Sequence, residues 1–307
     1  MAEDAKISRS LKELNRLTGL NLVLEGGNDD GGETLEKLSM LTAAYRDRYD
    51  RTNFVRNLLY GNVHSADIYA AASRFHIPES GRRVLYVIEC PEGEAERAEH
   101  ILKALFLRES GDLQAVLDEK RAVLIRQFRA KDTEEDKLSL AHMIVDMLNS
   151  EAMIKVRVGY GGEADSLKAM PDAFREAVLS LEIGRIFYSS ETVLHYAGLG
   201  IGRLIYDLPE ASSRLFLKEL FGDGSPDDFD EETKSIINAF FDNNLNIAET
   251  ARQLYVHRNT LVYRLEKLHQ MTGLDLRVFD DAIAMKLAMM INSSLNQKKT
   301  KTGGSPI

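Results

Sequence analysis

The chain has 307 residues, of which 44% are hydrophobic and 28% are charged, and its formal net charge is −9. This composition is typical of globular domains and excludes a disordered or fibrous chain, and the length leads us to expect two or three domains. The acidic balance argues against a protein that covers nucleic acid with its whole surface, but it permits one basic module. Because Cys90 is the only cysteine, an intramolecular disulfide and a cysteine-based zinc cluster are excluded.

The sequence contains no signal for a membrane. No run approaches the roughly 20 consecutive apolar residues that a membrane-spanning helix needs. The first ten residues, MAEDAKISRS, lack the apolar segment of a secretory signal. We therefore expect a cytoplasmic protein with no membrane partner.

The first 62 residues are predicted to be a helical segment. Residues 7–22 read as a helix that ends at Gly19, and residues 266–276 share this ending at Gly273, with both glycines as left-handed C-caps. Residues 26–32 (GGNDDGG) read as a flexible loop. From residue 33 to residue 60, steps of three or four predict one amphipathic helix. Its stripe could be a dimer seam or could pack within the same chain, and both alternatives stay open. The stripe consists of Leu35, Leu38, Leu41, Tyr45, Tyr49, Thr52, Val55 and Leu59.

Residues 63–222 alternate between strand and helix patterns and predict an α/β domain. The order of these patterns is β-α-β-β-α-β, the ferredoxin-like split unit. The overall fold class is therefore α+β multidomain, with a ferredoxin-like α/β domain followed by an all-α domain at residues 229–297. Residues 223–228 (DGSPDD) read as the linker between the two. The predicted elements are strand 83–89, helix 94–109, hairpin strands 113–118 and 121–128, helix 133–150, strand 153–159 and helix 171–188.

Residues 245–268 carry the pattern of a helix-turn-helix. Asn246, with Glu249 three residues later, has the spacing of a capped helix start. Ala251 lies where two helices cross and only a small side chain fits. The turn is expected at residues 255–257, although Tyr255 stands where glycine is usual. Apolar contacts that fix the angle between the helices are expected from Leu254, Val256 and Leu261.

The second helix of this pattern is predicted to run from about Arg258 to His269 and to read DNA. A 100° step per residue places Leu261, Leu265 and Leu268 on one side and polar residues on the other. Residues 251–270 hold four basic residues against one acidic residue, so positive charge gathers here. Arg258 and Asn259 are predicted to read guanine and adenine edges in the major groove. Contacts with phosphates are predicted for Thr260, Tyr263, Arg264 and Lys267.

The string TARQLYVHRNTLVYRLEKL, followed by TGLDL, resembles the C-terminal helix-turn-helix of the PucR/CdaR family of regulators. An aromatic residue before V-H-R-N-T is usual in that family, and a further helix follows, for which residues 279–295 are suited. The string is also similar, more distantly, to the Fis-type helix-turn-helix. The resemblance implies a transcription regulator whose partner is double-stranded DNA, and it slightly favours activation over repression.

The middle region resembles the GGDEF-like domain that precedes the helix-turn-helix in CdaR-type regulators, through FREA at 174–177, residues 193–204 and Leu208-Pro209. Related diguanylate cyclases have paired glycines at the hairpin turn and carboxylates that hold Mg²⁺. Here the turn reads LDEKR at 117–121, so a bulky side chain and a negative charge stand where a phosphate must lie. We expect a catalytically silent domain with no catalytic residues, cofactor or metal, and a flexible loop at 161–165 (GGEAD).

The sequence predicts a homodimer and permits a small-molecule effector. A single recognition helix buries too little surface for selective binding, whereas a symmetric dimer reads two half-sites. About 80 residues precede the α/β domain, too few for the sugar-diacid domain of CdaR-type regulators, so that ligand is not carried over. Two other functions stay open: a cyclic-dinucleotide enzyme, and a ligand- or partner-binding protein whose helix-turn-helix serves as a protein interface.

Overall fold

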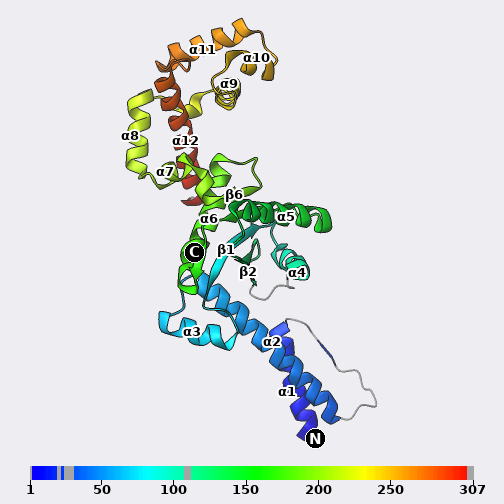
Figure 1. Ribbon diagram of the computed structural model, residues 1–307. Coiled ribbons are helices and arrows are strands. Elements are labelled where there is room, and N and C mark those ends of the chain that lie inside the picture. The colour runs from blue at the N-terminus through cyan, green and yellow to red at the C-terminus, as the bar shows by residue number, and fades with distance from the viewer. Residues whose placement is uncertain (1, 19–21, 24–30, 107–111, 303–307) are drawn as a thin grey trace. The chain divides into compact units, whose positions relative to one another are not determined.

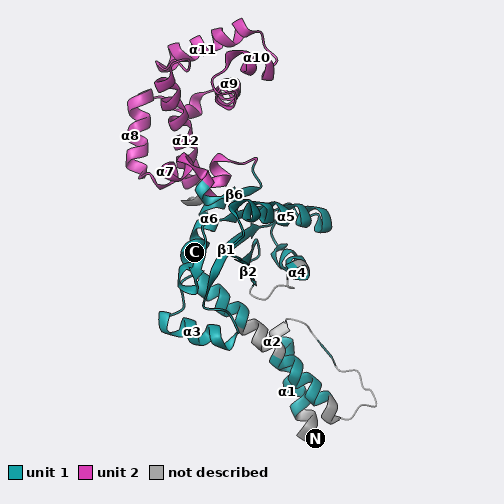
Figure 2. Cartoon of the chain, in the orientation of Figure 1, with its two compact units in different colours: residues 1–181, 191–197 teal, residues 182–190, 198–307 magenta. Residues whose placement is uncertain are grey.

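The computed structural model describes residues 2–18, 22–23, 31–106 and 112–302. The chain divides into two compact units, one of residues 1–181 with 191–197 and the other of residues 182–190 with 198–307 (Figure 2). Because these units are defined by internal contacts, they do not test the domain boundaries expected at residues 62, 222 and 229. Those boundaries stay predictions. Each unit is described by itself below.

The first unit begins with two long helices that pack side by side, α1 (Ala2–Thr18) and α2 (Gly31–Leu59) (Figure 1). Leu14 and Leu38 are buried, and so is Thr42, whose hydroxyl donates to the Leu38 carbonyl at 2.7 Å. The predicted long helix is confirmed, but Leu41 lies outside the buried stripe and is 49% exposed. Gly19 and the 26–32 loop lie outside the described residues.

The α/β part of this unit has the predicted ferredoxin-like order. After α3 (Ser65–Arg74) come β1 (Ser80–Glu89), α4 (Ala95–Phe106), β2 (Leu113–Asp118), β3 (Arg121–Phe128), α5 (Glu134–Ala152) and β4 (Arg157–Tyr160). The sheet order is β2-β3-β1-β4-β6, and β1 pairs antiparallel with both β3 and β4. The hairpin strands begin and end at the predicted residues, because their alternating apolar pattern is bounded by a short polar turn.

Both faces of the central strand are buried, which explains its continuous apolar run. Val84, Tyr86 and Ile88 lie on the face covered by α4 and α5, in a core that also holds Leu102 and Ile144. The Tyr86 hydroxyl donates to the Lys137 carbonyl at 3.1 Å. Burial raises the pKa of this hydroxyl far above its usual value, so Tyr86 acts as a neutral donor inside the core.

The strand expected at 153–159 is shorter than predicted. Met153 ends α5 in the left-handed conformation (φ 57°), and pairing with β1 begins only at Arg157. Ile154 and Val156 are buried in the core that α5 covers. Their apolar pattern therefore resembles that of a strand, although they lie in the connection that leads to one.

The GGEAD segment at 161–165 was expected to be a flexible loop, but its last two residues belong to a strand. It leads into β5 (Ala164–Ser166), which pairs with β1, and the Gly162 amide donates to Glu176 Oε2 at 2.7 Å. The unit continues with η1 (Leu167–Ala169), α6 (Met170–Phe187) as far as Leu181, and β6 (Val193–His195), which pairs parallel with β4.

Glu163 holds two cations at the start of β5. Its carboxylate accepts from Arg82 at 2.6 and 2.7 Å and also pairs with Lys137, whose side chain is 3% exposed. The hydrogen bonds from Arg82, followed by those from Lys137, lower the pKa of Glu163 from 4.5 to about 2. A carboxyl whose pKa is depressed in the folded state stabilises the fold above its unfolded pKa and loses this effect as the pH falls.

We expect Glu163→Gln to destabilise the chain by about 1–2 kcal/mol near pH 6, because Lys137 stays buried with a weaker partner. The difference from the wild type should shrink as the pH falls from about 4.5 toward about 2. Urea unfolding at several pH values measures it. Glu134→Gln is the matched control, since Glu134 also contacts Lys137 but is 73% exposed. An equal loss in both variants, or a difference independent of pH, would contradict the assignment.

The second unit is helical beyond the end of α6. It contains the end of η2 (Tyr196–Leu199), α7 (Ile201–Asp207), α8 (Glu210–Phe221), η3 (Pro226–Asp228), α9 (Glu231–Asp242), α10 (Ile247–Gln253), α11 (Arg258–Thr272) and α12 (Phe279–Thr302). The expected linker at 223–228 includes η3 and is bound to α12, since Asp227 accepts hydrogen bonds from Asn292 at 2.7 Å and Asn296 at 3.0 Å. Within the described residues, no helix is long and apolar enough to cross a membrane.

Candidate nucleic-acid interface

The first helix of the candidate interface, α10, starts where the sequence predicts. The Asn246 side chain accepts from the amides of Ala248 at 3.0 Å and Glu249 at 3.2 Å, which confirms the N-cap. The reciprocal bond expected from Glu249 to the backbone of Asn246 is not formed, because the Glu249 carboxylate pairs with Arg252 on the next turn. Ala251 is 5% exposed in the core that α10 shares with α11, so the small side chain lies where the helices cross, as predicted.

The turn between α10 and α11 is built around a strained tyrosine. The Val256 amide donates to the Ala251 carbonyl at 3.0 Å and the Tyr255 amide to the Arg252 carbonyl at 3.2 Å. These bonds close the end of α10 and require a left-handed residue between them, and Tyr255 adopts φ 54°. Leu254 and Val256 pack against the core, as predicted, whereas the Tyr255 side chain is 97% exposed.

We expect Tyr255→Gly to stabilise the chain by about 0.5–1 kcal/mol. A left-handed conformation costs a side-chain-bearing residue about 1–2 kcal/mol, and the greater freedom of glycine in the unfolded chain returns part of this gain. Urea unfolding measures the effect. Tyr255→Ala serves as the control, because alanine removes the ring and keeps the strain. A Gly variant no more stable than the Ala variant would show that the backbone at this turn is not strained.

The second helix, α11, begins at Arg258 and is capped by His257. Nδ1 of His257 accepts from the Asn259 amide at 3.2 Å, which leaves Nε2 as the ring nitrogen that can donate. Sequence reasoning placed His257 in the turn and missed this cap, because histidine is not among the usual capping residues. At the other end, Gly273 adopts φ 76° and its amide bonds to the His269 carbonyl at 2.7 Å, as predicted.

One face of α11 is buried and the opposite face is open. Leu261, Leu265 and Leu268 are each at most 3% exposed, in a core with Phe240 of α9 and Met285 of α12. Ala251, Leu254 and Val256 belong to the same core, which closes α9 to α12 into one body. The structure leaves five of the six predicted DNA-contacting side chains exposed, namely Arg258, Asn259, Thr260, Tyr263 and Lys267.

Ion pairs with neighbouring helices modify the charge of α11. Arg264, the sixth predicted contact, is half-buried and pairs with Glu232 of α9 at 2.6 Å, so part of its charge is neutralised by the protein. Glu266 pairs with Arg277 at 2.8 Å, which offsets the one carboxylate on α11. Arg258 makes no ion pair with any described residue. Among the described residues of α11, the positive charge without an ion pair therefore lies on Arg258 at the N-terminal end and on Lys267 further along the helix.

The hairpin turn between β2 and β3 is occupied by the protein's own groups. Leu117 is 7% exposed, and the Asp118 carboxylate pairs with Arg121 at 2.6 Å. The amides of Cys90 and Gly93 donate to the carbonyls of Lys120 at 2.7 Å and Glu119 at 2.9 Å. The loop after β1 thus binds directly to the turn that in cyclases approaches a nucleotide phosphate.

The two parts of the chain match known protein families. Residues 235–291 match the PucR C-terminal helix-turn-helix domain, and residues 60–183 match the GGDEF-like domain. Together with the geometry above, these matches define a helix-turn-helix protein with an accompanying GGDEF-like domain. The chain thus contains a PucR-type helix-turn-helix domain and a GGDEF-like domain, which agrees with the resemblance of its sequence to the PucR/CdaR family.

Relatives in the curated proteins are similar at low identity. The carbohydrate diacid regulator of Escherichia coli (strain K12) is 22% identical, over 84% of this chain and 69% of the relative. The purine catabolism regulatory protein of Bacillus subtilis (strain 168) is 29% identical, over 44% of this chain and 25% of the relative. The proline-responsive transcriptional activator PutR of the same organism is 22% identical, over 65% of this chain and 51% of the relative.

Proposed function

We propose that this protein is a sequence-specific DNA-binding transcription regulator that acts in the cytoplasm. The observation that carries the proposal is the division of α11 into a buried apolar face and an exposed polar face with Arg258 at its N-terminal end. Such a helix can enter the major groove of DNA while its apolar face stays docked on the protein. The three relatives described above, which are named as regulators or an activator, support the same conclusion.

Within this interface we assign base reading to Arg258 and Asn259. Both side chains are exposed on the first turn of α11, where a recognition helix approaches base edges. Thr260, Tyr263 and Lys267 would contact phosphates further along the helix. Arg264 would contribute less to DNA binding, because its guanidinium already pairs with Glu232. His257 adds an Nε2–H donor beside the first turn.

We further propose that the protein acts as a homodimer. One recognition helix buries less surface than the roughly 1,000–2,500 Å² typical of specific complexes. Two copies related by a two-fold axis would read two half-sites about one helical turn apart. Sedimentation with and without DNA tests this, and a chain that stays monomeric at micromolar concentration in both conditions contradicts it.

We assign no cyclase activity to the GGDEF-like domain. The bulky Leu117, the Asp118 carboxylate and the bound loop after β1 occupy the turn where a nucleotide phosphate would have to approach. Incubation with GTP and Mg²⁺ tests this directly, and formation of a cyclic dinucleotide would overturn the assignment.

The deciding experiment for the whole proposal is selection of bound sequences from a random DNA pool. We expect an enriched motif with two-fold symmetry, and binding that weakens steeply as salt increases, because cations are released from the phosphates. Absence of enrichment, together with salt-independent binding, would instead favour a protein in which the exposed face of α11 binds another protein.

A further inference from the structure

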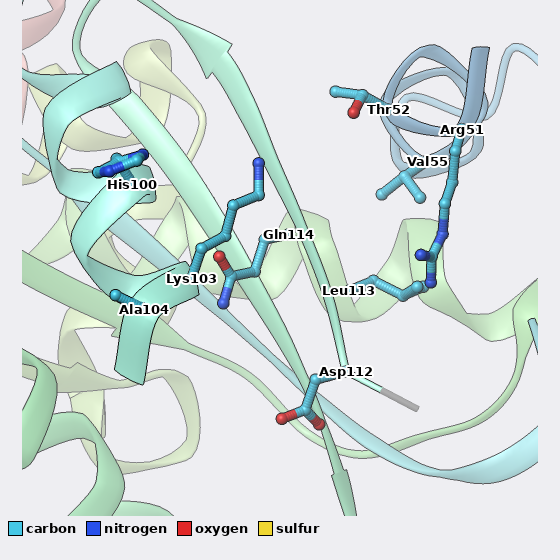
Figure 3. A pocket seen from close by; sticks show the side chains of 9 residues that line it. All are labelled: Arg51, Thr52, Val55, His100, Lys103, Ala104, Asp112, Leu113 and Gln114. Carbon is cyan, nitrogen blue, oxygen red and sulfur yellow. The ribbon is translucent and has the colours of Figure 1, made fainter. Parts of the chain in front are cut away.

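The first unit contains a cleft over the edge of the sheet, between α2 and α4. Its volume is about 500 Å³, within the range of small-molecule sites. The floor is the start of β2, the edge strand, which contacts both helices. Figure 3 shows Arg51, Thr52 and Val55 of α2 on one side, with His100, Lys103 and Ala104 of α4 on the other. The cleft is large enough for a metabolite and is enclosed by three separate elements.

The charges on the cleft favour an anion. Asp112, the carboxylate in its lining, is held by Arg126 at 2.5 Å and accepts from the Gln127 amide at 3.0 Å. Lys103 pairs with Glu99 of its own helix. Arg51 is exposed and makes no ion pair with any residue whose side chain the structure describes, a set that does not include residues 44–50 and 107–111. An exposed guanidinium that is not held by a protein carboxylate can bind the carboxylate of a ligand through two parallel hydrogen bonds.

A second polar group in the lining lacks a partner. The side-chain oxygen of Gln114, Oε1, is buried, and among the described residues no donor reaches it. A buried acceptor without a hydrogen bond costs about 1–3 kcal/mol. Because this oxygen has almost no exposed surface, the Gln114 amide must turn toward the cleft for a ligand N–H or O–H group to satisfy it. Val55, Leu113 and Ala104 supply apolar surface in the same lining.

We propose that this cleft binds a small organic carboxylate whose apolar body carries an N–H or O–H donor. Arg51 binds the carboxylate and Gln114 Oε1 accepts from the donor. The ligand would join α2 to α4 across β2 and so stabilise the packing of α2 on the sheet. The inference that this ligand is an effector rests on the proposed regulatory function. Its binding to the cleft does not, and it can be measured without DNA.

The test uses N-acetylglycine and N-benzoylglycine, with their methyl esters as uncharged controls. NMR of the methyl-labelled full chain reports on the cleft through Val55 and Leu113. We expect saturable shifts of these methyl groups with millimolar or tighter dissociation constants, and binding of the esters weakened about tenfold or more, as for loss of a charge-assisted hydrogen bond. Lack of saturable shifts with either acid up to about 10 mM, or equal binding of acid and ester, overturns the proposal.

Two variants assign the binding to this cleft. Arg51→Ala should weaken N-benzoylglycine binding about tenfold, whereas Arg56→Ala should leave it unchanged. Arg56 is the matched control because it lies on the same helix but lines a neighbouring cleft with Asp118 and Glu119. Equal effects of the two variants would overturn the assignment. DNA binding is measured separately on the same samples, so failure of the ligand site and failure of the regulatory function are distinguished.

Discussion

Replacement of Arg258 and Asn259 together by alanine is expected to weaken binding to a DNA site selected by the wild-type protein by about 2–6 kcal/mol. Each bidentate contact with a base contributes about 1–3 kcal/mol of discrimination, and the double variant removes two. Both side chains are exposed, and neither belongs to the core that closes α9 to α12. Folding should therefore be unaffected, and the loss should appear in a fluorescence anisotropy titration at fixed salt.

The same titration on random DNA separates base reading from general attraction. For the double variant, the affinity for random DNA should fall much less than the affinity for the selected site, because phosphate contacts carry non-specific binding. Arg214→Ala is the matched control, since Arg214 is also exposed but lies on α8, where it pairs with Glu210. If the control weakened specific binding as much as the double variant does, α11 would not be the reading element.

Lys267→Ala is expected to act differently from the Arg258 and Asn259 changes. Lys267 is exposed in the third turn of α11, where a side chain can meet the backbone of DNA. Its loss should weaken binding to selected and random DNA alike and reduce the dependence of log K on log salt by about one unit. An unchanged salt dependence, measured by anisotropy from low to high salt, would remove Lys267 from the interface.

Local chemistry explains why the helix-turn-helix could be predicted from the sequence. The cap at Asn246, the small Ala251 and the left-handed Gly273 each follow from residues within one turn of chain, and the structure confirms all three. The order of strands and helices was equally accessible, because the hairpin at 113–128 combines alternating apolar residues with a polar turn. These features depend on neighbours in sequence.

Contacts between distant residues could not be predicted in this way. The ion pair of Arg264 with Glu232 joins two helices and changes the part that an apparently available arginine can take in DNA binding. Glu163 was expected to lie in a flexible loop, but Arg82 approaches it from a strand residue 81 positions earlier. The cleft between α2 and α4 depends on packing of the same long-range kind. The spacing of apolar residues in the sequence shows which face of a helix or strand is buried. It does not show which other element packs against that face.

The glycines of the VGYGG segment at residues 158–162 also make a long-range contact that could not be predicted from the sequence. Gly159 lies in the middle of β4, where a sequence pattern shows only a strand residue without a side chain. In the structure, α6 crosses directly above it. A Cβ at this position would lie 2.5 Å from the Ala177 carbonyl oxygen and 2.7 Å from Leu181 Cγ. Because the contact includes backbone, rotation of a side chain cannot relieve it.

We therefore expect Gly159→Ala to destabilise the chain by about 3 kcal/mol or more, at the upper end of the cost of overpacking, since β4 or α6 must shift. Gly162→Ala is the matched control: the same methyl group would there lie 3.3 Å from Glu176 Oε2, the end of a flexible side chain, and should cost less than about 1 kcal/mol. Urea unfolding compares the two variants. If both lost the same stability, the loss would reflect the intrinsic effect of replacing glycine; a loss confined to Gly159→Ala would show that the close approach of α6 to β4 depends on this glycine.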